Sequence, residues 1–133
     1  MRKLKFLFAL LPLMLFTACS SAGSGPEVVA EKFIKAVLSA DFESAKALCT
    51  EETKPTIDLI VAFTAGKTDE LKKSTIKIEK KDVTISEDGN SADVVLLVSG
   101  GYDLQKGKIM ESEEEKVHLV KVDNKWLVEN KLK

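Results

Sequence analysis

The sequence has 133 residues, of which 44% are hydrophobic and 31% are charged, and its formal net charge is −1. This length and hydrophobic fraction fit one folded domain with a modest core. The near balance of 20 basic and 21 acidic residues does not support a nucleic-acid-binding protein, which would need a basic face.

The first 18 residues have the parts of a secretory signal. Arg2, Lys3 and Lys5 form a basic start, an apolar run extends over residues 6–16, and small residues precede Cys19. The apolar run is about a dozen residues long, shorter than the roughly 20 that a membrane-spanning helix needs. We therefore expect a cleaved signal rather than a permanent transmembrane anchor.

Cys19 closes the segment Leu15-Phe16-Thr17-Ala18-Cys19, which resembles the lipobox of bacterial lipoproteins. The usual motif has leucine where this chain has Phe16, and a small residue where it has Ala18. The resemblance implies lipidation of Cys19, with acyl chains such as palmitate, and attachment to the cell envelope. No acidic residue directly follows Cys19, and by resemblance to the sorting rules of two-membrane bacteria this implies the outer membrane, facing the periplasm. A plain secretory signal cut nearby is the alternative.

Cleavage would remove residues 1–18 with three basic residues, leaving 17 basic and 21 acidic residues in the chain. Residues 19–25 would form a short polar tether, and residues 26–133 a single domain. The expected partners are the membrane, through the lipid, and an unidentified protein or small molecule. No nucleic acid, cofactor or metal is expected, and the sequence leaves the oligomeric state open.

The folded part is expected to begin with helices. Pro26 and Glu27 form a favourable helix start, and Asp41 is expected to cap a second, short helix. Thr50 is expected to cap a third helix that stops near Gly66. The apolar residues that mark these helices are Val29, Phe33, Ala36, Val37, Ala40, Phe42, Ala45, Leu48, Cys49, Ile57, Ile60, Val61 and Phe63.

After a further helical turn over residues 68–73, the apolar period changes to that of strands. The apolar pairs Ile76/Ile78 and Val83/Ile85 are out of phase, which predicts a bulge between them, near residues 80–81.

The next strand, over residues 92–102, is apolar on both faces and is expected to be central, with a kink or bulge near its end at Gly100-Gly101. A third strand over about residues 109–122 and a last strand over residues 125–131 complete a four-stranded antiparallel meander. Helices followed by strands predict an α+β fold, with the helices on one face of a curved sheet.

Two motifs resemble the cystatin-like or nuclear-transport-factor-2-like cone fold of small secreted domains. The first is the helical opening Pro26–Ala36 followed by Asp41–Lys46, and the second is the strand-pair turn Asp123–Val128. The similarity covers nearly the whole domain and is strongest with lipoproteins described only as domains of unknown function. Enzymes of this fold use a pocket Asp paired with Tyr, Asp or His, and none of their motifs is matched here.

The candidate pocket-lining residues are Tyr102, His118 and Trp126, with no catalytic residue assigned. Asp58, Asp93 and Asp103 are further carboxylates that a catalytic site could use. Most carboxylates alternate with apolar residues along strands, which favours a solvated outer face. The acidic residues 111–115 are likewise expected at a solvated strand edge rather than in a calcium site.

Three residues that could take part in chemistry or ligand binding are better explained by structural roles. His118 is the one histidine, and neither a second histidine nor a cysteine pair stands at metal-ligand spacing. Cys49 is expected to fill the core and, with Cys19 lipidated, to have no disulfide partner. Trp126 is expected to pack in the core together with Val128.

These observations favour a membrane-anchored, non-enzymatic binding or interaction module. Two alternatives stay open. One is a small enzyme of isomerase or dehydratase type, recognised by a buried carboxylate in its pocket near His118 or Tyr102. The other is a purely structural accessory lipoprotein whose cone is filled by its own side chains.

Overall fold

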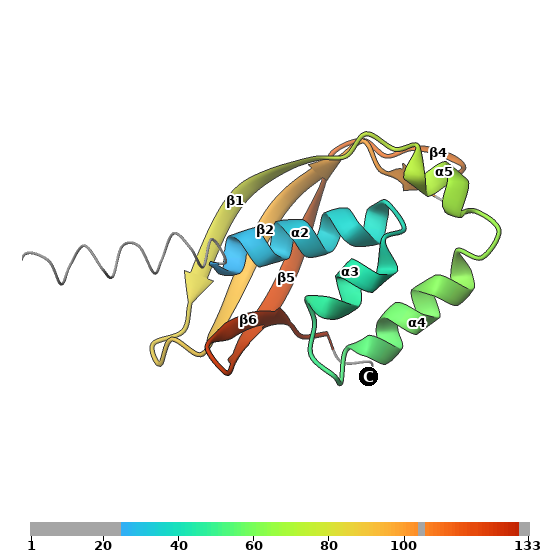
Figure 1. Cartoon of the computed structure of the whole chain (residues 1–133). Helices are drawn as coiled ribbons and strands as arrows, with labels where there is room; N and C mark the ends of the chain where they lie inside the picture. Colours follow the sequence, from blue (N-terminus) through green and yellow to red (C-terminus); the bar gives the residue numbers. More distant parts are fainter. Residues whose placement is uncertain (1–24, 104–105, 131–133) are drawn as a thin grey trace, which may run out of the picture.

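The computed structural model describes residues 25–103 and 106–130. Its first helix, α2 (Pro26–Leu38), has proline at the start and Glu27 in the first turn, as predicted. Proline has no N–H to leave unsatisfied there, and the carboxylate lies at the positive end of the helix dipole. The helix lies across one face of the sheet (Figure 1). Its buried apolar residues include Val29, Ala30, Phe33 and Ala36.

A sharp break separates α2 from α3 (Phe42–Ala47). Ala40 takes a left-handed φ of 64° at this break. The Asp41 carboxylate accepts hydrogen bonds from the Ser44 N–H at 3.4 Å and from the Ser44 hydroxyl at 2.7 Å. The bond from the N–H satisfies a donor that the first turn leaves free, so the predicted cap at Asp41 is confirmed.

The third helix begins later than predicted. α4 extends over Lys54–Phe63, with Pro55 in its first turn, and α5 extends over Thr68–Lys72. Thr50 belongs to a preceding turn, since its carbonyl accepts the Thr53 N–H and the two hydroxyls lie 2.7 Å apart. Pro55 suits a first turn because that position needs no N–H. The predicted cap at Thr50 is therefore wrong by about one helical turn.

Four antiparallel strands form the main sheet in the order β1-β2-β5-β6. Their bounds are β1 Lys77–Ile85, β2 Ser91–Ser99, β5 Glu113–Val122 and β6 Lys125–Val128. The pairing of β1 with β2 shifts between Lys80 and Asp82, which confirms the predicted bulge. β2 lies between β1 and β5, as its apolar sequence predicted. Helices on one face of this curved sheet make the predicted α+β fold (Figure 1).

A second sheet of two short strands interrupts the meander. It consists of β3 (Tyr102–Asp103) and β4 (Lys108–Ile109). Gly100 ends the pairing of β2 because its φ of 85° turns the chain, and its N–H donates to the Met110 carbonyl at 3.3 Å. The predicted kink near the end of the strand over residues 92–102 is therefore confirmed at Gly100, whereas the predicted continuous strand over residues 109–122 is wrong. Each of these two stretches is divided between the main sheet and this hairpin.

The core lies between α2 and the inner face of the sheet. Buried residues alternate along β2 and β5, and they are Ala92, Val94, Leu96, Val98, Val117 and Leu119. Cys49 joins this core with 4% of its surface exposed, which confirms its predicted packing role. Burial raises the pKa of the Cys49 thiol. Since the thiolate is the reactive form, this cysteine is poorly suited to nucleophilic chemistry.

Several predictions concern residues outside the described ranges. The signal over residues 1–18, the lipidation of Cys19 and most of the tether belong to this group. The last strand ends at Val128, earlier than the predicted residue 131, which is itself outside the description. Within residues 25–103 and 106–130, no helix combines the length and apolar character needed to cross a bilayer.

Candidate functional site

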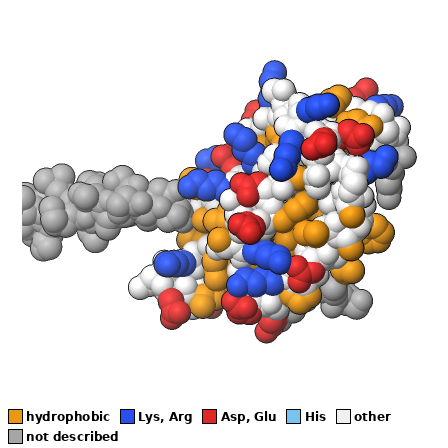
Figure 2. Space-filling view, turned by 45° about the vertical axis from the view of Figure 1, so that its right-hand side comes forward, with side chains coloured by type: hydrophobic (Ala, Val, Ile, Leu, Met, Phe, Trp, Pro, Cys, Tyr) orange, Lys and Arg blue, Asp and Glu red, His pale blue; other side chains and the backbone are white. Residues whose placement is uncertain are grey.

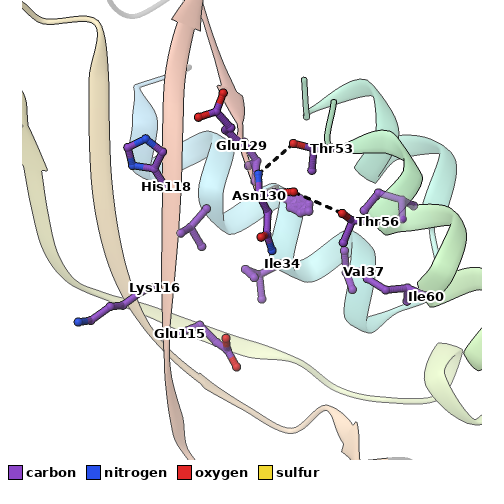
Figure 3. A pocket seen from close by; sticks show the side chains of 14 residues that line it. Ile34, Val37, Thr53, Thr56, Ile60, Glu115, Lys116, His118, Glu129 and Asn130 are labelled. Atoms are coloured by element: carbon purple, nitrogen blue, oxygen red, sulfur yellow. Dashed lines mark hydrogen bonds between the residues drawn. The ribbon is translucent and has the colours of Figure 1, made fainter. Parts of the chain in front are cut away.

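An open pocket lies between α2, α4 and the adjoining part of β5 and β6, with a volume of about 300 Å³ (Figure 3). We call it the helix–sheet pocket. On the helical face of the molecule, apolar side chains gather in a band between groups of charged ones (Figure 2). The apolar residues that line the pocket are Phe33, Ile34, Val37, Ile57, Ile60, Val117 and Val128.

Two threonines at the start of α4 fix the chain that follows β6 to this pocket. The buried Thr53 hydroxyl accepts a hydrogen bond from the Asn130 N–H at 2.9 Å. The Thr56 hydroxyl donates to the Asn130 carbonyl at 3.3 Å. Figure 3 shows both bonds along one rim of the pocket. The backbone of Asn130 is therefore held on both sides, so this rim is a defined wall.

Glu115 directs a carboxylate into the pocket. Side chains alternate along a strand, so Glu115 shares the inner face of β5 with the buried Val117 and Leu119. Figure 3 places Glu115 on the pocket side of β5 and Lys116 on the opposite side. The prediction that strand carboxylates lie on a solvated outer face is therefore wrong for Glu115. Burial raises the pKa of its carboxyl, and the negative charge of Glu113 raises it further.

A second pocket, of about 320 Å³, adjoins the β3–β4 hairpin, and we call it the hairpin pocket. Val37, Ile60 and Glu115 line both pockets, so the Glu115 carboxylate stands at their border. Tyr102, one of the candidate pocket-lining residues, lines the hairpin pocket and not the helix–sheet pocket. The two pockets together form a groove between the helices and the inner face of the sheet.

Solved structures resemble this chain over most of its length. A "putative NTF2-like transpeptidase" from Campylobacter jejuni is 24% identical, covers 79% of this chain and 97% of its own, and gives a TM-score of 0.54. An NTF2-like protein of unknown function from Shewanella oneidensis is 11% identical, covers 75% and 88%, and gives a TM-score of 0.50. The fold is NTF2-like. No family profile and no curated protein matches the sequence, and at these identities the likeness concerns the fold alone.

In this NTF2-like domain, the His118 ring lies on the outer face of the sheet. Its Nδ1 is 2.8 Å from Oδ1 of Asp93, its cross-strand neighbour on β2, and both side chains are exposed. The backbone of His118 lines the helix–sheet pocket. There its carbonyl accepts a hydrogen bond at 2.9 Å from the N–H of Glu129, which lines the same pocket. The ring itself extends away from the pocket (Figure 3).

Trp126 packs against the core without lining either pocket. It is partly buried, it stands opposite Lys121 on β5, and the Lys121 Nζ lies 5.3 Å from its ring centroid. At this distance the ammonium interacts with the ring face.

The remaining sequence candidates stand apart from the groove or at its edge. Asp58 pairs with Lys46 at 2.6 Å on the exposed side of the helices. Asp103 lines the hairpin pocket, and its carboxylate accepts the Lys106 N–H at 3.1 Å. Within the described part of the chain, no three His, Cys, Asp or Glu side chains converge as metal ligands would. Glu115 is the residue that sequence reasoning missed, although its two-residue spacing from Val117 was a usable signal.

Proposed function

We propose that this chain is a lipid-anchored, non-enzymatic binding domain of the bacterial cell envelope, with its ligand in the helix–sheet pocket. The observation that supports ligand binding is the open cavity of about 300 Å³ between α2, α4 and the sheet. Ligand sites are typically concave, mostly apolar and provided with a few polar groups, as this pocket is. A cone filled by its own side chains would leave no such space.

The proposed anchor is the lipid on Cys19, supported by the signal-like residues before it and the small, polar residues after it. Several acyl chains hold a protein firmly on a membrane, whereas one chain alone binds marginally. The short tether would keep the pocket close to the membrane surface. We place the domain at the outer membrane, facing the periplasm, because no acidic residue directly follows Cys19.

The anchor is testable through Cys19→Ser. This substitution removes the thiol that accepts lipid, so we expect the chain to leave the membrane pellet and to lose incorporation of labelled palmitate in bacterial cells. Cys49→Ala is the matched control, because it removes the other cysteine of the chain and should leave both properties unchanged. Persistent labelling of Cys19→Ser would contradict lipidation at this residue.

Ligand binding is testable through Val37→Phe. Val37 lines both pockets, so an aromatic ring there would fill the groove. We expect small molecules that co-purify with the full chain, identified by mass spectrometry, to fall about tenfold in this variant, the change that a loss of about 1.4 kcal/mol produces. Leu59→Phe is the control, since Leu59 is 45% exposed on α4 and lines neither pocket. Equal retention by the two variants would contradict the proposal.

Glu115 supports a second candidate, an enzyme that uses general acid–base catalysis. The specific observation is a half-buried pocket carboxyl whose pKa is raised, with Tyr102 lining the same hairpin pocket. A raised carboxyl pKa suits proton transfer near neutral pH. The co-purification experiment separates the two candidates. When the co-purified compound is supplied again to the full chain, a binding domain releases it unchanged, whereas an enzyme converts it into a different compound.

A further inference from the structure

Glu115 brings negative charge into the groove. Among the described residues, the Glu115 side chain takes part in none of the ion pairs or side-chain hydrogen bonds. The described residues that line the hairpin pocket include Asp103, Glu113 and Glu115 but no Lys, Arg or His. The lysine at the helix–sheet pocket, Lys116, extends from the opposite side of β5 (Figure 3).

The surroundings of Glu115 are otherwise apolar. Val37 and Ile60 face it from α2 and α4, and Leu96 stands opposite it on β2 with no exposed surface. A charged carboxylate in such a place loses part of its hydration, which is the larger of the two causes of its raised pKa, the charge of Glu113 being the other. A cation placed against it would supply the partner that the described residues do not.

We propose that the groove binds a small organic cation, with an apolar body in the helix–sheet pocket and an ammonium group against Glu115. This inference rests on the proposed ligand-binding function and names the chemical class of the ligand. The pocket volume of about 300 Å³ fits an aryl or alkyl group. Charge complementarity selects the head group, because a carboxylate disfavours an anion and gains less from a neutral hydroxyl.

The proposal predicts a dependence on pH with a defined sign. The pKa of the free Glu115 carboxyl lies above its ordinary value of 4.5, and a bound cation would lower it. Binding would then release a proton, so affinity should rise with pH until the free carboxyl is fully ionised. The other titratable groups facing the groove are Glu113, Tyr102, Asp103 and Glu129, and α2 and α4 contribute none.

The experiment compares three probes that share one apolar body. They are 3-phenylpropylamine, 3-phenylpropan-1-ol and 3-phenylpropanoate, titrated into the full chain and followed by ligand-observed NMR. We expect the amine to bind about fivefold tighter than the alcohol, the ratio for about 1 kcal/mol of charge interaction at a half-exposed site. The propanoate should bind weakest.

Two variants assign the effect to one side chain. Glu115→Gln should reduce amine affinity about fivefold and abolish the dependence on pH, with alcohol affinity unchanged. Because burial penalises the charged form, this variant should be no less stable than the parent chain at neutral pH. Glu114→Gln makes the same charge change on the outer side of β5, where Glu114 is exposed, and should leave amine affinity unchanged.

Each outcome has one meaning. Tighter amine binding that only Glu115→Gln removes supports the inference. Equal binding of amine and alcohol, or equal loss in both variants, overturns the organic cation and leaves the ligand-binding domain standing. Binding of none of the three probes overturns the inference. It overturns the proposed function only if Val37→Phe also leaves the co-purifying molecules unchanged.

Discussion

Gly100→Ala is expected to destabilise the domain by about 3 to 5 kcal/mol, among the larger effects that one substitution produces. Gly100 has a φ of 85°, and a Cβ built there lies 1.9 Å from the backbone oxygen of Thr75. A left-handed conformation costs a non-glycine residue about 1–2 kcal/mol. The remainder comes from displacing a backbone carbonyl at the entry to β1, which cannot rotate away as a flexible side chain would.

Gly89→Ala separates these two contributions. Gly89 also has a left-handed φ, 74°, but a Cβ there meets nothing within 4 Å. We expect this control to lose only the conformational cost, about 1–2 kcal/mol, in urea unfolding followed by circular dichroism. Equal losses in the two variants would show that the contact with Thr75 is unimportant. Since the chain enters the β3–β4 hairpin after Gly100, Gly100→Ala should also alter the shape of the hairpin pocket, whereas Gly89→Ala should not.

Local signals in the sequence predicted the elements whose geometry is set by neighbouring residues. The bulge in β1 followed from the phase change between Ile78 and Val83, and the structure shows the register shift there. The cap at Asp41 followed from the preference of a carboxylate for free N–H groups. Both are decided within a few residues, which is why sequence reasoning alone was sufficient.

Features decided by distant parts of the chain were not predictable in this way. Phe63 marked the third helix correctly, yet it is 82% exposed. Apolar spacing predicts a helix, but the face it buries depends on what packs beside it. The division of the predicted strand over residues 109–122 likewise depends on Gly100, whose N–H bonds to the Met110 carbonyl across the hairpin.

Glu115 illustrates the same limit at the candidate site. The acidic run over residues 111–115 has the composition of a solvated strand edge, and Glu114 does lie on the exposed outer face. Alternation along the strand puts Glu115 on the same side as Val117. That this side faces a pocket depends on α2 and α4, which pack over it. The α+β class was therefore predictable from apolar spacing, whereas the chemistry of the groove depends on how the helices pack against the sheet.

Ile57→Ala is expected to destabilise the domain by about 2–4 kcal/mol and to lower the affinity of the groove for its ligand. Of the residues of α4, all of which the structure describes, Ile57 alone is fully buried. The helix is therefore attached to the core mainly through this side chain, and it forms one wall of the helix–sheet pocket. Removing it enlarges a pocket that is already open, so water can enter and the cost should not reach the highest values for cavity formation.

Leu59→Ala is the matched control on the same helix. Leu59 is 45% exposed, so its truncation removes little buried surface, and we expect a change within about 0.5 kcal/mol. Urea unfolding should show a larger loss of stability for Ile57→Ala than for Leu59→Ala. Hydrogen exchange should show that Ile57→Ala, and not Leu59→Ala, makes α4 open faster than β2. Equal exchange in α4 for both variants would contradict the attachment through Ile57. Because α4 and β5 face each other across the groove, loosening α4 should also weaken binding of the amine probe without any change at Glu115.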